Sequence, residues 1–221
     1  MRQPVPRPED ALAPRAGEAT RQALLAAAER MFGEQGIDAV SLLAIARAAG
    51  QGNKNAVQYH FGSKGGLIRA ILRSRADAIE RRRAELTVAA GAEGKLDDVP
   101  TLVRAMYLPV IEQVDGEGRF TFARFLLQFM NHPGSQDVLI GPAEIERDNS
   151  VTEQIRFLMQ RALPHLTLEV VEWRVFMLLR LMLTCLVAHE DAVLRGTATM
   201  TRDEVVRQTL SMVTAGLSAP A

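Results

Sequence analysis

The sequence contains a single cysteine, few aromatic residues and no long apolar run. Cys185 is the single cysteine in 221 residues, so no disulfide can form within the chain. Aromatic residues make up only 5% of the sequence, while small and unbranched apolar residues are abundant, a composition that favours helices over sheets. The most apolar run, residues 175–188, is interrupted by Arg180 and is too short to span a bilayer. The chain also lacks an apolar signal segment, so we expect a cytoplasmic protein without a membrane partner.

Patterns typical of enzymes and metal sites are also missing. The histidines form no i, i+4 pair that could hold a metal ion; they are His60, His132, His165 and His189. Cys185 lies within an apolar helical pattern, which is typical of a packed thiol rather than a nucleophile. The glycines of residues 62–66 do not have the spacing of a phosphate-binding loop. We therefore expect no catalytic residue, no metal and no cofactor, and a helical enzyme is the least supported function.

Negative charge is absent from one long window. Between Asp38 and Asp77 there is no acidic residue, whereas six cations occur there: Arg47, Lys54, Lys64, Arg69, Arg73 and Arg75. Residues 1–90 hold 14 Lys and Arg against 9 Asp and Glu, and residues 91–221 hold 12 against 17. A helical segment that excludes carboxylates suits a polyanionic partner, and double-stranded DNA is the obvious candidate.

The periodicity of apolar residues predicts an all-α fold of about nine helices and no strands. The expected helices cover residues 20–36, 42–49, 53–60, 64–91, 120–131, 141–163, 167–193 and 201–216, with one more beginning near Pro100. Ser41 and Ser63 are expected to cap helices, and Thr201 with Glu204 forms a capping box. Residues 1–17, with four prolines and no periodicity, are expected to form a disordered tail.

The short helix expected at residues 53–60 has two different faces. At 3.6 residues per turn, Ala56 and Val57 point toward the preceding helices, while Gln58 and Tyr59 point outward with Lys54 and Asn55. Amide side chains can bind an adenine edge, and lysine can reach the acceptors of guanine. For any one of these residues, an ordinary cap or a solvated side chain explains the residue type equally well. Helix–turn–helix spacing, absence of acid and a polar outer face together favour DNA binding.

Residues 20–72 resemble the DNA-binding domain of the TetR family of bacterial transcriptional regulators. The resemblance rests on the segments MFGEQGIDAVS, IARAAG and YHFGSK, in that order. It implies a homodimer with a DNA-binding domain at residues 18–66 and a helical ligand-binding and dimerisation domain at residues 67–217. It also implies phosphate or backbone contacts by Ser41, Tyr59, His60 and Lys64, and base contacts by Asn53, Lys54, Asn55 and Gln58.

Two features depart from the pattern of that family. The turn GQGN is one residue longer than usual, and Gln58 stands where an aromatic residue is common. The longer turn supports an alternative function, a helical small-molecule binding protein that has lost DNA binding.

The C-terminal half carries bulky apolar residues suited to an unknown small-molecule effector, although a plain core explains them as well. The candidates for effector binding are Met106, Phe122, Phe125, Phe129, Phe157, Trp173 and Met177. The helix at residues 167–193 is apolar on nearly every side, so it must be covered on both sides. We expect this helix and the last one to pair with their symmetry mates in a four-helix interface, although a large core within one subunit is an alternative explanation. The residues expected at this interface are Leu179, Met182, Leu183, Leu186, Val206, Leu210 and Val213.

These observations combine into one expected function. The chain is expected to be a ligand-responsive repressor that binds a near-palindromic operator as a homodimer. A small molecule in the C-terminal domain is expected to release it from DNA.

Overall fold

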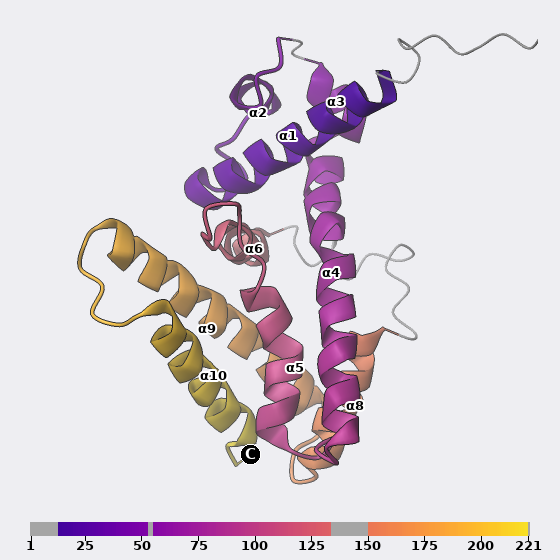
Figure 1. Ribbon diagram of the computed structural model, residues 1–221, viewed down its shortest axis with the longest axis vertical. Helices are drawn as coiled ribbons and strands as arrows, with labels where there is room; N and C mark the ends of the chain where they lie inside the picture. Colours follow the sequence, from indigo (N-terminus) through magenta and orange to yellow (C-terminus); the bar gives the residue numbers. More distant parts are fainter. Residues whose placement is uncertain (1–12, 53–54, 134–149, 221) are drawn as a thin grey trace, which may run out of the picture. The chain divides into compact units, whose positions relative to one another are not determined.

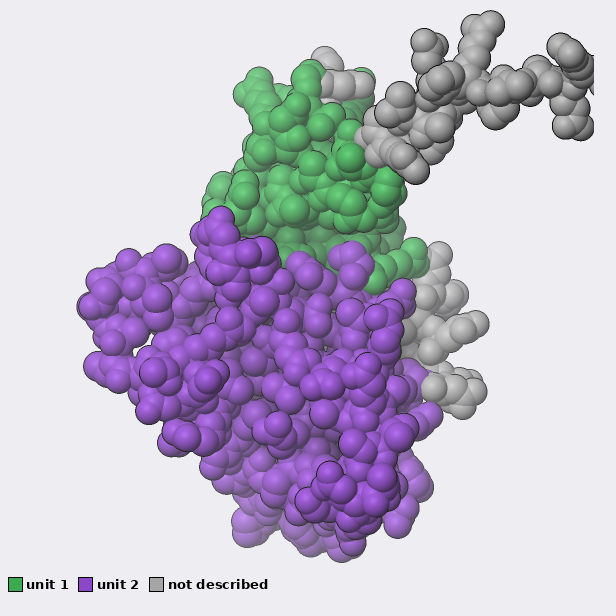
Figure 2. Space-filling model, in the orientation of Figure 1, with its two compact units in different colours: residues 1–73 green, residues 74–221 purple. Residues whose placement is uncertain are grey.

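The computed structural model describes residues 13–52, 55–133 and 150–220, with side chains described from residue 17 onward. These parts of the chain form nine helices and no strand, so the all-α prediction is confirmed. They form two compact units, one up to Arg73 and one from Ser74 (Figures 1 and 2). The boundary falls within helix α4 (Lys64–Ala92), further along the chain than the boundary expected after residue 66.

The first unit contains three helices and the start of α4. The three are α1 (Ala13–Gln35), α2 (Leu42–Ala48) and α3 (Ala56–Phe61). Its core consists of fully buried apolar side chains from every one of these helices: Leu24, Ala28, Phe32, Ile45, Ala46, Val57, Leu67 and Ile71. Helix α1 begins at Ala13, inside the segment expected as a tail, because Pro14 is tolerated in the first turn of a helix. The rest of that segment, residues 1–12, lies outside the described residues.

The second unit packs five further helices with the remainder of α4. They are α5 (Val99–Ile111), α6 (Thr121–Asn131), α8 (Val151–Ala162), α9 (Leu168–Leu194) and α10 (Arg202–Ser218). Figure 1 shows α9 and α10 side by side, and these two helices contact each other along their length. They approach closely at Gly216, where an added Cβ would lie 2.9 Å from Leu178 Cδ2. Within residues 13–52, 55–133 and 150–220, no helix is long and apolar enough to cross a membrane.

The helix starts follow the capping pattern of the sequence. Thr201 Oγ1 accepts a hydrogen bond from the Glu204 N–H, and Glu204 reaches back to the Thr201 N–H at 2.7 Å, so the predicted capping box is confirmed. Thr167 caps α9 and Ser150 caps α8, each with a side-chain oxygen that accepts a hydrogen bond from the N–H three residues later. The start expected for α8 at residues 141–142 lies outside the described residues.

Two carboxylates of the second unit are held ionised by hydrogen bonds. Burial acts to raise the pKa of Glu80, but hydrogen bonds from Thr152 and Arg83 outweigh it and hold that pKa below its usual value. At Asp115, burial is likewise outweighed, chiefly by a hydrogen bond from Thr121, and the pKa is again lowered. Each of these groups therefore favours the folded state most when it is ionised.

The lowered pKa values of Glu80 and Asp115 predict that acid destabilises the second unit. A carboxyl group with a lowered pKa contributes stability above its unfolded pKa of about 4, and that contribution is lost as the pH falls through the folded value. The midpoint of urea unfolding should therefore decrease when the pH is lowered from 5 to 3. In Glu80→Gln the protein should be less stable at pH 7 and should lose less stability on acidification. An equal pH dependence in wild type and variant would contradict the assignment to Glu80.

Candidate nucleic-acid interface and effector cavity

The turn between α2 and α3 is set by a glycine at the end of α2. Gly50 has a φ of 70°, a left-handed conformation that a side chain rarely adopts. Its N–H donates to the Arg47 carbonyl at 3.0 Å, and the Gln51 N–H donates to the Ala46 carbonyl at 2.9 Å. This hydrogen-bond pattern closes α2 and redirects the chain toward α3. Ser41 starts α2, where its Oγ accepts a hydrogen bond from the Ala44 N–H at 3.1 Å, so it is a cap with an exposed side chain.

Helix α3 separates buried and exposed side chains as the sequence indicated. Ala56 and Val57 are buried, while Gln58 is exposed and Tyr59 retains 85% of its accessible surface. The helix begins at Ala56, so Asn55 is its exposed N-terminal cap residue. Asn53 and Lys54 lie outside the described residues. The His60 ring is half-buried and packs edge-on against Tyr59, with ring centroids 5.1 Å apart.

The connection from α3 to α4 is unusually close. Gly62 has a φ of 73°, and Ser63 Oγ accepts a hydrogen bond from the Gly66 N–H at 3.0 Å. An added Cβ on Gly66 would lie 2.0 Å from the Phe61 carbonyl oxygen, so only glycine fits there. The glycine thus allows the first turn of α4 to lie directly against the end of α3.

Lys64 has a structural contact that the sequence did not reveal. Its Nζ donates to the Ile37 carbonyl at 2.8 Å and lies 6.0 Å from the centre of the Phe32 ring. The side chain is half-buried and ties the start of α4 to the loop after α1. An ammonium group carries three N–H donors, so this bond leaves two for a phosphate.

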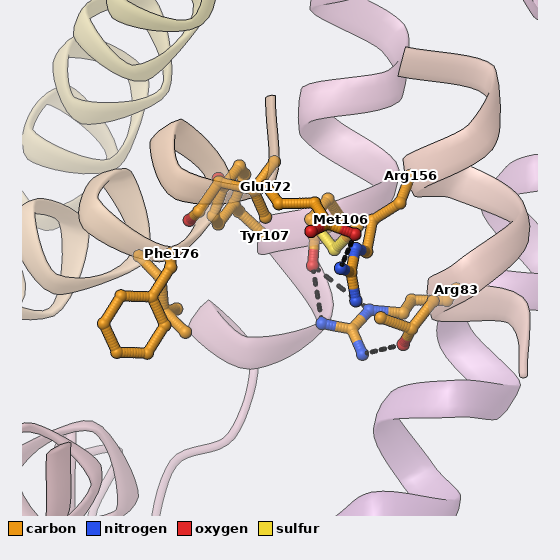
Figure 3. A pocket seen from close by; sticks show the side chains of 9 residues that line it. Arg83, Met106, Tyr107, Arg156, Glu172 and Phe176 are labelled. Carbon is orange, nitrogen blue, oxygen red and sulfur yellow. Dashed lines mark hydrogen bonds and ion pairs between the residues drawn. The ribbon is translucent and has the colours of Figure 1, made fainter. Parts of the chain in front are cut away.

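The second unit contains a cavity of about 230 Å³ (Figure 3). It is lined by residues from α4, α5, α8 and α9: Arg83, Met106, Tyr107, Thr152, Arg156, Glu172, Val175, Phe176 and Leu179. Among the residues predicted for effector binding, Met106 lines this cavity. Phe122, Phe125 and Phe129 are buried along α6, with neighbouring rings 6.2 and 6.1 Å apart. Phe157, Trp173 and Met177 are exposed and do not line it.

Arg83 is the main polar group of the cavity, and the sequence did not identify it. It stands in a run with Arg81 and Arg82, but only 14% of its side chain is exposed. Its Nε and Nη2 donate to the Met106 carbonyl at 3.2 and 3.0 Å, and its Nη1 donates to Glu80 at 2.9 Å and Thr152 at 2.7 Å. Burial lowers the pKa of Arg83, partly offset by Glu80. These acceptors lie on α4, α5 and α8, so the sequence of α4 alone could not reveal that Arg83 is buried.

Three further polar residues line the cavity: Tyr107, Arg156 and Glu172. The Tyr107 hydroxyl donates to the Val175 carbonyl at 3.0 Å, and burial raises the pKa of this tyrosine. Arg156 donates to Glu153 on its own helix and to Glu172 on α9, each at 2.6 Å. Figure 3 shows Arg156 joined to Glu172, and Arg83 with its separate hydrogen bonds to other lining residues.

The residues predicted for the dimer interface lie mostly inside the subunit. Five of them are at most 7% exposed: Met182, Leu183, Leu186, Leu210 and Val213. Leu179 and Val206 are partly exposed, and Leu179 lines the cavity. Helix α9 instead exposes a stripe of Trp173, Met177 and Leu181, and α10 exposes Met212. The other exposed large apolar side chains of α9 are Leu168, Phe176, Val193 and Leu194.

Comparison with known proteins identifies similarity in both units. Residues 24–71 match the family described as bacterial regulatory proteins, tetR family, and residues 104–216 match the tetracyclin repressor-like C-terminal domain. Among solved structures, the chain is similar to a TetR family transcription regulator from Marinobacter aquaeolei VT8, with a TM-score of 0.58 and 16% identity. That similarity covers 91% of this chain and 97% of the other, and at this identity it supports the fold alone. No curated protein matches the sequence.

Proposed function

Because the chain belongs to the TetR family of bacterial transcriptional regulators, we propose that it is a repressor released from its operator by a small molecule. The observation that carries DNA binding is the α2–turn–α3 arrangement, in which Ala56 and Val57 are buried while Gln58 and Tyr59 are exposed. This exposed face lies in the middle of the acid-free window of the sequence. A short helix of this kind can enter the major groove without repulsion from carboxylates.

The proposed contacts divide into base contacts and phosphate contacts. Gln58 would read a base edge together with Asn55 and with Asn53 or Lys54. The phosphate backbone of the duplex would be contacted by polar side chains at the start of α2, the end of α3 and the start of α4: Ser41, Tyr59, His60 and Lys64. Phosphate contacts release counterions, so the affinity for any duplex should fall steeply as salt increases. Gel shifts at several salt concentrations test this, and an affinity independent of salt would contradict the proposal.

The base-reading role of Gln58 gives a specific prediction. In Gln58→Ala the discrimination between the preferred operator and its single-base variants should decrease by about 1–3 kcal/mol at one base pair. Affinity for unrelated DNA should change little, because the lost contact is to a base rather than to a phosphate. Competition gel shifts with wild type and variant measure both quantities. Gln22→Ala, at an exposed site on α1, is a suitable control. Unchanged discrimination at every operator position would exclude Gln58 from base reading.

We propose that two subunits pair through the outer face of α9 and the adjoining face of α10. Trp173, Met177 and Leu181 follow each other at intervals of four residues on α9, so they form one stripe, and Met212 is exposed on α10. These side chains take the place of the buried residues expected from the sequence. Pairing of the same surface on both subunits gives a two-fold dimer. Recognition helices that bind two half-sites one turn of duplex apart would have to be separated by about 34 Å.

The dimer proposal predicts that a charge in this stripe separates the subunits. Met177→Glu should shift the protein from dimer to monomer at micromolar concentration, because the carboxylate would be buried without a partner. Operator affinity should fall with it, since each half-site would then be bound independently. Sedimentation velocity and gel shifts measure these effects. Val88→Glu, at a 73% exposed site on α4, should leave both unchanged. A dimer that persists in Met177→Glu would place the interface elsewhere.

Effector release would act through α4. Arg83 of α4 lines the cavity, while the first turn of the same helix is anchored in the first unit by Lys64. An effector that alters the contacts of Arg83 with Met106 and Thr152 would favour a different position of α4. It can shift the equilibrium only by the difference in its affinity for the two conformations.

A further inference from the structure

The cavity of the second unit combines two anchored cations with one exposed anion. Arg83 and Arg156 line it from α4 and α8, and Glu172 lines it from α9. The remaining wall that faces them is mainly apolar and includes Met106, Val175 and Leu179. Such a mixture indicates a ligand with an apolar body and a small number of polar atoms.

Each guanidinium group has at least one partner other than Glu172. Arg83 has two hydrogen bonds to the Met106 carbonyl and further ones to Glu80 and Thr152. Arg156 is held by Glu153 from its own helix at 2.6 Å, and 28% of its side chain is exposed. Arg83 cannot leave the cavity without breaking these contacts, and Arg156 keeps its bond to Glu153 when Glu172 departs.

Glu172, in contrast, is free to leave. Its side chain is 45% exposed, and its bond in the structure is the one to Arg156 Nη2 at 2.6 Å. An exposed ion pair of this type contributes little to stability, because the separated carboxylate is well solvated in water. Another carboxylate can therefore replace it on Arg156 at little cost.

We propose that the cavity binds a compact organic acid whose carboxylate replaces Glu172 on Arg156. Its apolar body lies against Met106, Val175 and Leu179, and the volume of about 230 Å³ restricts it to a small molecule. This inference rests on the proposed function, since it takes the cavity to be the effector site. Arg156 gives the acid a charge-assisted hydrogen bond, and an uncharged ligand of the same shape lacks that bond.

Three acids with matched neutral and cationic partners test the proposal. Isothermal titration calorimetry on the full-length protein would compare benzoate, 2-naphthoate and hexanoate with the corresponding amides and with benzylamine. At least one acid should bind about tenfold or more tightly than its amide, as expected for one charge-assisted hydrogen bond. An amide or amine that binds as tightly as the best acid would overturn the proposal. So would the absence of binding by all three acids at millimolar concentration.

Two variants test the exchange itself. Glu172→Gln removes the competing carboxylate, so the best acid should bind several-fold more tightly. Arg156→Gln should abolish the preference for the acid over its amide. Glu169→Gln, on the same helix but outside the cavity lining, should behave as wild type. Thermal melts of each variant would show that it is folded. An acid affinity unchanged in both Glu172→Gln and Arg156→Gln would refute the exchange.

The same samples separate this inference from the function on which it rests. Gel shifts with an operator fragment would be recorded with and without the best acid. If the protein binds DNA but no acid, the regulator stands and the acid assignment fails. If the protein binds acid but no DNA, the acid assignment stands and the regulatory function fails.

Discussion

Replacing Gly66 by alanine should strongly weaken operator binding and destabilise the first unit by about 3 kcal/mol or more. An added Cβ would lie 2.0 Å from the Phe61 carbonyl oxygen, and a backbone atom cannot move aside as a flexible side chain can. The contact is relieved only if the end of α3 shifts away from α4. Because α3 carries Gln58 and Tyr59, we expect operator affinity to fall by at least about a hundredfold. Thermal melts and gel shifts measure the two effects.

The neighbouring glycine provides the control for this substitution. An added Cβ on Gly65 would lie 3.8 Å from its nearest neighbours, which is an ordinary contact. Gly65→Ala should therefore leave DNA binding intact and stabilise the helix by about 0.5–1 kcal/mol. If Gly66→Ala were as stable and as active as Gly65→Ala, the close approach of α3 and α4 would be incorrect.

Replacing Glu190 by alanine should destabilise the second unit by about 2–3 kcal/mol. Glu190 accepts hydrogen bonds from the Phe120 N–H at 2.6 Å and from Arg124 Nη2 at 3.0 Å, and only 12% of its side chain is exposed. It therefore joins the start of α6 to α9. Without Glu190, the Phe120 N–H loses its acceptor, and Arg124 keeps Asp191 as its remaining ion-pair partner. Denaturant unfolding followed by the fluorescence of Trp173, the single tryptophan, measures the loss.

An exposed glutamate is the matched control for Glu190. Glu117 pairs with Arg119, but 72% of its side chain is exposed. Glu117→Ala should therefore change the free energy of unfolding by no more than about 0.5 kcal/mol. Equal effects of Glu190→Ala and Glu117→Ala would show that the link between α6 and α9 contributes nothing specific.

Local signals in the sequence predicted the helices and the faces of α3 well. Ser41 and the Thr201–Glu204 pair mark helix starts because their side chains bond backbone groups three residues away, a relation that sequence spacing fixes. The two faces of α3 follow from the 3.6-residue period in the same way. Both features depend only on residues close together in the chain.

Contacts between distant residues could not be predicted from such signals. The acceptor of Lys64 is the backbone carbonyl of Ile37. Every residue has such a carbonyl, so the residue types do not show which one accepts the hydrogen bond. Arg83 lies in a run of three arginines, and only the packing of α5 and α8 selects it for burial.

The faces of α9 could not be assigned for a related reason. Because α9 is apolar nearly all round, periodicity does not distinguish the buried side of Met182 and Leu183 from the exposed side of Trp173 and Met177. The residues expected at the interface were chosen because they are apolar, and apolar residues occur on both the buried and the exposed side of α9. Burial in the folded subunit separates them.

The most direct test of DNA binding is a selection of genomic fragments by the intact protein at low ionic strength. The account predicts that fragments with a near-palindromic site are retained, and that their affinity falls by about 10³ or more between 50 and 200 mM salt. Failure of the folded protein to retain any fragment, even in dilute buffer, would contradict the account and favour a helical small-molecule binding protein without DNA binding.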